Sequence, residues 1–594
     1  MDIEKILKDL ENKYCEYAQF VTDTVLLELE SILKEQKRYN HVAVVGAGEH
    51  TIHLIEDFGG VLGKFDIIDA NPENCKFIIQ YPQYKAYGYE KIYSYDCLII
   101  SSFEFAAQIT NTLIDNNYKG KIVDLYQELD AIGLHLPIEY YDLSFYPYTS
   151  SIVARYLLQN KNYKSGSLKH LIYISLHNRD LLWAKNYLKD IIESYPNESH
   201  MDRDTLESIE IIEKELLHEF ELRDKRDIFA FWLDALRYNL SKEMPFINKC
   251  RERGMDFTNF YASTISTRNT YGCMMECSDE ISLFLEENHK NVLYSLMNEK
   301  GYNSYRGDGH GVLELESFNY KEVELVDYRV ASTKIIWDCL LKVLKSTKPS
   351  FVIIHMILET HPPFISPLSS QWNKYTTGND AWRLESDNHL NEFLDNALIS
   401  AQYIDMELEY YLSIILSKGI AILFADHGVG LTKQSAQYKE DFSHLPLCIV
   451  GDGIQHKVEK GLLDTKRFTD ILYSILQRNK DIVYSDILQI NGIDGYSKEW
   501  IKYILDNASY HIGMQYNGVR TQTDIYVMDA TGEEFYYLIP NEVDNEIENP
   551  KYQERIRYLK EKTLQKHIDI YTHPKFMNSH LIYEAQGKPF IWRN

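Results

Sequence analysis

Apolar runs of strand length alternate with helical segments in the first quarter of the chain. A run at 41–46 leads into a glycine-rich turn that opens a helix, and further runs follow at 65–71, 95–102 and 120–125. Strand-length runs separated by helices predict parallel strands joined by crossover helices. We therefore expect a Rossmann-like domain over residues 41–146, preceded by an N-terminal helix over residues 1–40.

The glycine-rich turn of this domain raises the question of a bound nucleotide. In dinucleotide-binding folds the phosphates lie on a turn such as Gly46-Ala-Gly48, and an acid about 20 residues further on, here Asp69, holds the ribose. The third glycine of that fingerprint is replaced by Thr51. Two interpretations stay open: a nucleotide site at Gly46, Gly48 and Asp69, or a degenerate module used for packing or for binding a partner.

The pattern changes after residue 146. Residues 147–223 carry apolar positions at helical spacing and end in a mixed acidic and basic run, which is typical of a solvated helical face. They predict a helical linker region. From residue 224 onward strand-length runs return, and two of them end in side chains that can bind a metal ion.

These two runs have the same layout. Ile228-Phe-Ala-Phe-Trp-Leu233 ends in Asp234, and Ile420-Ala-Ile-Leu-Phe-Ala425 ends in Asp426 and His427. Continuous apolar runs suit central strands of a parallel sheet, and the carboxyl ends of such strands carry the sites of open α/β folds. Since two carboxylates and an imidazole are good ligands for a divalent cation, we predict a metal site at Asp234, Asp426 and His427.

A hydroxyl-rich segment, Ser263-Thr-Ile-Ser-Thr-Arg-Asn-Thr270, lies between the two runs. Such clusters are common in turns and helix caps. A hydroxyl held by a metal ion, however, becomes a nucleophile at neutral pH. The segment therefore supplies candidates for a nucleophile beside the predicted metal.

In this order, the segments resemble the sulfatase branch of the alkaline-phosphatase superfamily, which includes sulfatases, phosphodiesterases and phosphoethanolamine or phosphoglycerol transferases. The resemblance implies an α/β chain: the Rossmann-like domain and helical linker, then an alkaline-phosphatase/sulfatase-type catalytic domain over 224–490 and a C-terminal subdomain with a small antiparallel sheet over 491–594. Further segments that carry the resemblance are 244–261, 301–310, 360–364, 445–451, 518–521 and 533–538.

The resemblance also assigns roles. The family nucleophile lies ten residues after the Phe of a Phe-Thr-Asn segment and six before a Cys-Met pair, which gives Thr267 as both nucleophile and metal ligand; Thr264 and Ser266 stay as alternatives. His361, His310 and His444 are the implied catalytic histidines, which donate protons or bind phosphate oxygens. Asp308 is a candidate ligand for a second metal ion.

Two features that define sulfatases are missing. The segment after Thr267 lacks the proline of the motif in which a Cys or Ser is oxidised to formylglycine, and Asp308 stands where the family has a lysine. We therefore predict a soluble phosphotransferase that depends on zinc or manganese and forms a phosphothreonine.

The expected group is of the phosphoethanolamine, phosphoglycerol or phosphoramidate type, passed from a phosphorylated donor to a sugar hydroxyl of a surface glycan, such as a capsule or lipooligosaccharide. Three alternatives stay open: a phosphodiesterase or phosphatase with water as acceptor, a sulfatase, and a scaffold without activity.

Composition narrows the partners and the location. The net charge of −26 argues against general binding of nucleic acid or anionic membranes. The charged N-terminus is not a signal peptide, and apolar runs of about eight residues are too short to span a membrane. Eight sparse cysteines suit reduced thiols, so we expect a cytoplasmic protein. The sequence predicts no oligomeric state.

Overall fold

The computed structural model divides the chain into two compact units. The first comprises Met1–Glu215 with Ile365–Lys374, and the second comprises Leu216–Phe364 with Tyr375–Asn594. The structure describes residues 2–72, 81, 83–143, 148–264, 267–278, 291–309, 323–362, 364–369, 390–429, 439–477, 482–492, 516–529, 533–540 and 544–565.

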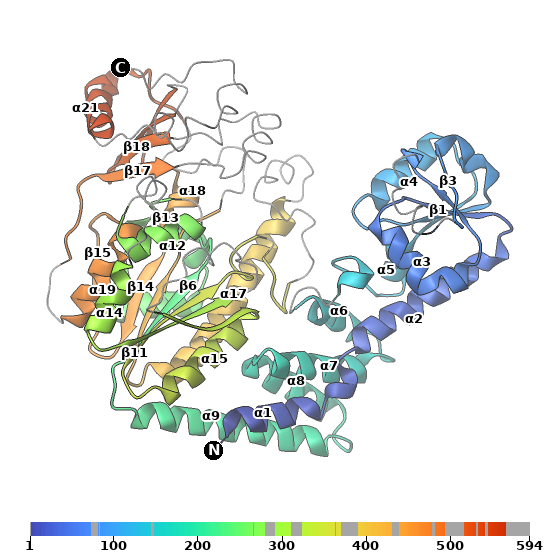
Figure 1. Cartoon of the computed structure of the whole chain (residues 1–594), viewed down its shortest axis with the longest axis horizontal. Helices are drawn as coiled ribbons and strands as arrows, with labels where there is room; N and C mark the ends of the chain where they lie inside the picture. Colours follow the sequence, from blue (N-terminus) through green and yellow to red (C-terminus); the bar gives the residue numbers. More distant parts are fainter. Residues whose placement is uncertain are drawn as a thin grey trace. The chain divides into compact units, whose positions relative to one another are not determined.

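The first unit contains a five-stranded parallel sheet in the order β3-β2-β1-β4-β5. In Figure 1 this sheet lies among helices α3, α4 and α5. The strand order runs outward in both directions from β1, as in doubly wound folds, which confirms the Rossmann-like prediction. The bounds are β1 (Val42–Val45), α3 (Glu49–Leu62), β2 (Asp66–Ile68), β3 (Ala86–Tyr87), η5 (Tyr89–Ser94), β4 (Cys97–Ile100), α4 (Ala106–Asp115), β5 (Lys121–Asp124), α5 (Leu125–Ala131) and η6 (Tyr140–Asp142).

Helices make up the rest of the first unit. The expected N-terminal helix is two helices separated by a turn, because the fully buried Tyr14 turns inward and donates a hydrogen bond to Asp202 Oδ1 at 2.7 Å. The bounds are α1 (Ile3–Asn12), η1 (Cys15–Tyr17), α2 (Phe20–Glu35), η2 (Gln36–Arg38), α6 (Thr149–Leu157), α7 (Lys164–His177), α8 (Leu181–Ser194) and α9 (His200–Leu222), the last of which continues into the second unit.

The second unit is built on an eight-stranded mixed sheet in the order β10-β9-β11-β6-β12-β14-β7-β15. Figure 1 shows this sheet between α14 and α19 on one side and α15 and α17 on the other. The bounds of its strands are β6 (Ile228–Leu233), β7 (Met255–Phe257), β9 (Asn303–Gly309), β10 (Glu324–Val330), β11 (Ser350–Met356), β12 (Ile420–Phe424), β14 (Leu447–Gly451) and β15 (Lys457–Glu459).

Strand β6 positions the site. All six of its residues are buried, and it pairs in parallel with β11 on one side and β12 on the other. Because the carboxyl ends of parallel strands meet at one edge of a sheet, Asp234 after β6 and Asp426 after β12 come together there. The turn after β6 passes through Ala235 at φ +57°, and the Ala235 N–H donates to Asp426 Oδ1 at 3.1 Å.

Two smaller sheets complete the second unit. One has the order β13-β8-β16, and the other is antiparallel in the order β17-β18-β19-β20 and packs against α21. The bounds are β8 (Phe260–Tyr261), β13 (His444–Leu445), β16 (Leu463–Asp464), β17 (Leu488–Gly492), β18 (Tyr516–Arg520), β19 (Asp524–Asp529) and β20 (Glu534–Leu538).

Helices of the second unit are α10 (Tyr238–Ser241), α11 (Pro245–Arg253), α12 (Thr267–Glu276), α14 (Val292–Glu299), α15 (Ser332–Lys345), α17 (Leu390–Ile415), α18 (Glu440–Ser443), η9 (Thr465–Arg467), α19 (Phe468–Leu476), η10 (Pro550–Tyr552) and α21 (Gln553–Leu564). Among the described residues, no helix is long and apolar enough to cross a membrane. The predicted α/β class, with its small antiparallel C-terminal sheet, is confirmed.

Candidate active site

Three predicted ligands come together at the carboxyl end of the central sheet. Oxygen atoms of Asp234 and Asp426 and a ring nitrogen of His427 all lie within 4.8 Å of one another, and all three residues are buried. His427 Nε2 is 3.7 Å from Asp234 Oδ1 and 3.4 Å from Asp426 Oδ2. The strand-end pattern therefore brings two carboxylates and one imidazole to one point.

Thr267 joins this cluster from the first turn of α12. Its Oγ1 lies 3.1 Å from Asp234 Oδ2 and 3.0 Å from His427 Nε2. Its side chain is half-buried. The hydroxyl thus contacts two candidate metal ligands and remains accessible to solvent. This position suits a nucleophile.

The two carboxylates differ in charge state. Burial raises the pKa of Asp234, but the hydrogen bond from His355 and the imidazoles of His361, His355 and His427 outweigh it and hold the pKa at about 2. Burial, and then the neighbouring Asp234 charge, raise the pKa of Asp426. Two buried carboxylates side by side are costly unless a cation offsets them.

The ring of His427 is fixed by its other nitrogen. Its Nδ1 lies 2.7 Å from the Gly428 carbonyl oxygen, so Nδ1 carries a proton and donates it to that acceptor. The Nε2 lone pair of the neutral ring then faces the cluster, as a metal ligand requires. Burial lowers the pKa of His427, while Asp426 and Asp234 outweigh burial and raise it.

His355, which the sequence analysis missed, holds Asp234 from behind. It is the next-to-last residue of the buried strand β11, its Nε2 is 2.8 Å from Asp234 Oδ2, and its ring packs on Trp232 with centroids 4.1 Å apart. Burial lowers the pKa of His355, but the hydrogen bond to Asp234 and the charge of the nearby Asp308 outweigh it and raise the pKa to about 9. The one available signal was a single imidazole inside an apolar run.

A chain of buried charges continues beyond His355. Its Nδ1 is 3.7 Å from Asp308 Oδ1, and Asp308 Oδ2 is 2.8 Å from Arg306 Nη2. Arg306 Nη1 donates to the Tyr271 hydroxyl at 3.0 Å. Asp308, a candidate ligand for a second metal, is therefore paired with a guanidinium, which supplies the positive charge that a cation would bring.

A comparison with protein families identifies the domain that this site belongs to. The model of the family described as Sulfatase matches residues 231–478, a range that includes Asp234, Thr267, Asp426 and His427. We refer to residues 231–478, the range that this family model matches, as the sulfatase-family domain. No curated protein sequence matches the chain.

Solved structures align with 57–60% of the chain. The phosphonate monoester hydrolase of Agrobacterium radiobacter aligns over 57% of this chain and 95% of its own, at 11% identity and a TM-score of 0.46. A 2-O GAG sulfatase aligns over 60% and 94%, at 13% identity and a TM-score of 0.44. A protein of the alkaline phosphatase superfamily from Vibrio parahaemolyticus aligns over 59% and 94%, at 13% identity and a TM-score of 0.40.

The residues of the sulfatase-family domain fit a divalent cation. Asp426 Oδ2 is buried and accepts no hydrogen bond from any residue that the structure describes. An orphaned carboxylate oxygen is costly unless a cation takes it. Asp234, Asp426 and His427 would hold such an ion. Oxygen and nitrogen donors of this kind suit zinc and manganese alike, so the types of ligand do not distinguish between the two metals.

The predicted catalytic histidines have different surroundings. The ring of His361 lies beside that of His427, with centroids 6.3 Å apart, and its Nδ1 donates to the Pro362 carbonyl oxygen at 2.7 Å. Next to it, Thr360 Oγ1 donates to the Asp234 carbonyl oxygen at 2.6 Å, which ties this segment to the site. His310 lies outside the described residues.

His444 is engaged elsewhere. Its Nδ1 is 2.5 Å from Glu440 Oε2, its Nε2 is 2.9 Å from the Thr258 carbonyl oxygen, and its ring stacks between Tyr238 and Tyr261. Both ring nitrogens are thus taken by acceptors. Within the described part of the chain, no contact links His444 to Thr267 or to the three ligands.

Of the two alternatives to Thr267, the structure describes Thr264 alone. Thr264 Oγ1 is buried and has no hydrogen-bond partner among the described residues, and Thr264 lines a separate pocket. Ser266 lies outside the described residues. Among the hydroxyls that are described, Thr267 is the one that contacts Asp234 and His427.

In the N-terminal domain, the three residues predicted to bind a nucleotide lie together. Gly46 has φ +109°, and a Cβ there would meet the Ser101 carbonyl oxygen at 2.8 Å, so the turn requires glycine. Gly48 caps α3. The Asp69 carboxylate accepts a hydrogen bond from the Ala47 N–H at 2.9 Å. This backbone N–H, which a phosphate would use, therefore already has an acceptor.

Proposed function

We propose that the sulfatase-family domain is a metal-dependent phosphotransferase with Thr267 as its nucleophile. The observation that carries this proposal is the position of Thr267 Oγ1, 3.1 Å from Asp234 Oδ2 and 3.0 Å from His427 Nε2. A divalent cation bound there would lower the pKa of the adjacent hydroxyl and offset the charge of a phosphate group.

The first half-reaction forms a phosphothreonine. Thr267 enters as the alkoxide, after its proton has passed to solvent, and its Oγ1 attacks phosphorus in line with the leaving alcohol. A Thr267–phosphorus ester bond forms while the phosphorus–oxygen bond to that alcohol breaks. His361, whose Nδ1 is held by the Pro362 carbonyl, gives the departing oxygen a proton from Nε2.

The second half-reaction reverses these roles. An acceptor hydroxyl gives its proton to His361 and attacks the phosphorus of phosphothreonine, which releases Thr267. Asp234 stays ionised throughout, since its pKa is held at about 2. With a sugar hydroxyl as acceptor the enzyme is a transferase, and with water it is a hydrolase.

The nucleophile favours phosphate over sulfate esters. Known sulfatase chemistry requires a Cys or Ser that is oxidised to formylglycine, and a threonine cannot be processed in that way. The position of the family lysine is occupied by Asp308, which is paired with Arg306 at 2.8 Å. We therefore propose a phosphoethanolamine, phosphoglycerol or phosphoramidate group as the group transferred, with a surface-glycan hydroxyl as acceptor.

The proposal is tested by turnover of nitrophenyl esters. Wild type and Thr267→Ala are incubated with the nitrophenyl phosphate monoester, a phosphodiester and the sulfate ester, with Mn²⁺ or Zn²⁺ and with a chelator. We expect cleavage of a phosphate ester that needs the metal and falls at least about a thousandfold in the variant. Preferred turnover of the sulfate ester, or full activity of Thr267→Ala, would overturn it.

A further inference from the structure

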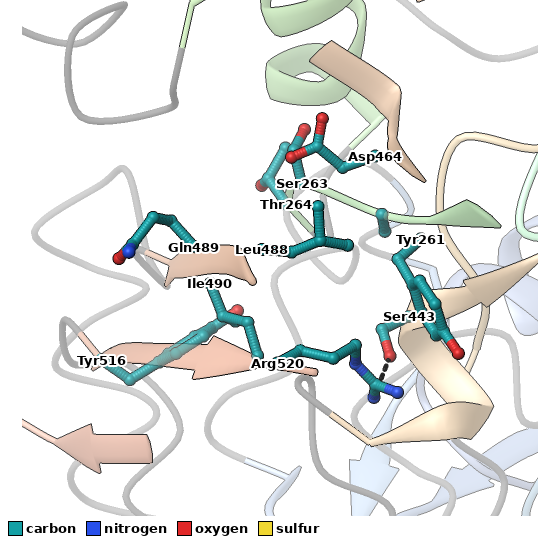
Figure 2. Close-up of a pocket in the computed structure, with 11 residues that line it drawn as sticks. Tyr261, Ser263, Thr264, Ser443, Asp464, Leu488, Gln489, Ile490, Tyr516 and Arg520 are labelled. Atoms are coloured by element: carbon teal, nitrogen blue, oxygen red, sulfur yellow. Dashed lines mark hydrogen bonds between the residues drawn. The ribbon is translucent and has the colours of Figure 1, made fainter. Parts of the chain in front are cut away.

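A small pocket lies between the loop that precedes Thr267 and the C-terminal sheet. Its walls come from the loop at residues 262–264 and from strands β8, β16, β17 and β18. Figure 2 shows Ser263, Thr264 and Asp464 together on one side, with Tyr516 and Arg520 on the other. Its enclosed part is about the size of one water molecule, which is also the size of a hydroxyl group.

Two buried oxygen atoms on this wall have no partner. Thr264 is 2% exposed and Asp464 is 5% exposed, and neither Thr264 Oγ1 nor Asp464 Oδ1 has a hydrogen-bond partner among the described residues. Leaving a buried polar atom unsatisfied costs about 1–3 kcal/mol, and more for a charged group. A group that donates hydrogen bonds is therefore expected to occupy the pocket.

The backbone holds these two oxygens in place. Asp464 is the register partner of Tyr261 between β16 and β8. The Ser263 N–H donates to Thr465 Oγ1 at 3.0 Å, and the hydroxyls of the same two residues lie 2.6 Å apart. The loop that carries Thr264 and the strand that carries Asp464 are thus tied together, so the two open acceptors are preorganised.

The charges around the pocket favour a neutral hydroxyl over a phosphate as its ligand. The Arg520 guanidinium is engaged by Glu440 Oε1 at 2.5 Å, by Ser443 Oγ at 2.9 Å and by the ring face of Tyr261 at 4.3 Å. The carboxylate of Asp464 faces the pocket, with Lys466 Nζ 3.3 Å from its other oxygen. A phosphate would meet that carboxylate, whereas a neutral hydroxyl can donate to it.

The pocket is close to the proposed nucleophile. Thr264 precedes Thr267 by three residues, so their Cα atoms lie at most about 11 Å apart. Thr270 Oγ1, in the first turn of α12, also donates to the Thr264 carbonyl oxygen at 3.3 Å. This separation is compatible with an acceptor that places one hydroxyl in the pocket and another at the reacting phosphorus.

We propose that this pocket binds a second, non-reacting hydroxyl of the acceptor, so that the enzyme selects polyols such as glycerol or a sugar ring over simple alcohols. Asp464 Oδ1 and Thr264 Oγ1 accept the hydrogen bonds of that hydroxyl. The inference rests on the proposed function, because it names the acceptor class for the same reaction.

The test compares two acceptors. A nitrophenyl phosphodiester is turned over by the metal-loaded protein with glycerol or 1-propanol present, and the transfer products are quantified against the hydrolysis product. Transfer releases nitrophenol and forms the new phosphodiester of the alcohol. We expect the wild type to favour glycerol, and Asp464→Asn to lower the ratio of glycerol to propanol transfer at least tenfold, since a hydrogen bond to a charged group is lost.

Two further variants sharpen the result. Thr264→Val removes one acceptor without changing the side-chain shape, and we expect it to lower the ratio about fivefold. Asp470, six residues after Asp464, has an exposed carboxylate that pairs with Arg467. Asp470→Asn is the matched control, and we expect it to keep the wild-type ratio. An unchanged ratio in both pocket variants would overturn the proposal and leave the pocket as the place of a bound water.

Failure of the phosphotransferase proposal is recognised separately. If no nitrophenyl ester is cleaved, binding is measured instead by ligand-observed NMR with glycerol on the full chain. A saturation-transfer signal that disappears in Asp464→Asn supports the pocket without the proposed reaction. A signal of equal size in the wild type and in both pocket variants contradicts it.

Discussion

At the scale of single residues, the site depends on buried charges that stabilise one another. Asp234 is fully buried, yet its pKa is held at about 2 because three imidazoles surround it and one of them donates to it. The donor, His355, lies 2.8 Å from Asp234 Oδ2 and leaves Oδ1 toward His427. His355 therefore positions a candidate metal ligand.

We predict that removing this donor weakens metal binding. His355→Phe keeps a ring against Trp232 but loses the hydrogen bond, so Asp234 is no longer oriented; the dissociation constant for Mn²⁺ should rise about 10- to 100-fold. Isothermal titration calorimetry measures it directly. His355→Gln, which retains a donor, should recover part of the affinity. Wild-type affinity in both variants would show that His355 only fills space.

The clustering of the candidate metal ligands could be predicted from the sequence because each one stands at the end of an apolar strand. Asp234 and Asp426 stand at strand ends, and neighbouring parallel strands bring their carboxyl ends together whatever the conformation of the connecting loops. His355 could not be found in this way. It lies within a strand, and its contact with Asp234 bridges 121 residues and depends on the register of β11 with β6.

At the scale of elements, a cluster of ion pairs joins the C-terminal antiparallel sheet to the small sheet that contains β13. Glu440 in α18 binds His444 Nδ1 in β13 and Arg520 Nη1 in β18, each at 2.5 Å. Burial raises the pKa of Glu440, but the hydrogen bond from His444 and the charge of Arg520 outweigh it and lower the pKa to about 2. His444, predicted as a catalytic group from its resemblance alone, is occupied in this cluster.

The cluster makes a prediction about acid stability. Since the folded-state pKa of Glu440 lies below its ordinary value of 4.5, its stabilisation is present above about pH 4.5 and is lost as pH falls toward 2. Glu440→Gln should lower the free energy of unfolding at pH 7 by on the order of 2 kcal/mol and flatten this acid limb. Urea unfolding between pH 3 and pH 7 checks it. An equally steep limb in the variant would contradict the assignment.

Some elements were harder to predict than the strand ends. The N-terminal pattern indicated one helix, but the buried Tyr14 divides it, and a tertiary hydrogen bond to Asp202 is invisible to periodicity. Arg520 and Glu440 are 80 residues apart, and nothing in either segment alone indicates their pairing. Local sequence patterns predict the strands and their order along the chain. Which side chains pair between different elements can be seen only in the three-dimensional structure.

At the scale of the whole molecule, the sulfatase-family domain is expected to gain stability from its metal. A ligand that binds only the folded state stabilises it by about 2.7 kcal/mol at 100 times its dissociation constant. Nucleotide binding by the Rossmann-like domain at Gly46, Gly48 and Asp69 stays a prediction, as does the cytoplasmic location.

The metal effect can be separated from the fold with one substitution. Asp426→Asn removes a ligand and also relieves the repulsion between two buried carboxylates. In a chelator, the variant should melt at the same temperature as the wild type or higher; on adding Mn²⁺, the wild type alone should rise in Tm. Differential scanning calorimetry records both. An equal metal-induced rise in the variant would show that the ion binds elsewhere.

The most direct test of the central claim is to look for the phosphoryl group on Thr267. The metal-loaded protein is mixed with a nitrophenyl phosphodiester, quenched in acid during turnover, digested and examined by peptide mass spectrometry. We predict a phosphoester on Thr267 that is absent with a chelator and absent in Thr267→Ala. Turnover without any modified Thr267, or a modified residue elsewhere in the chain, would contradict it.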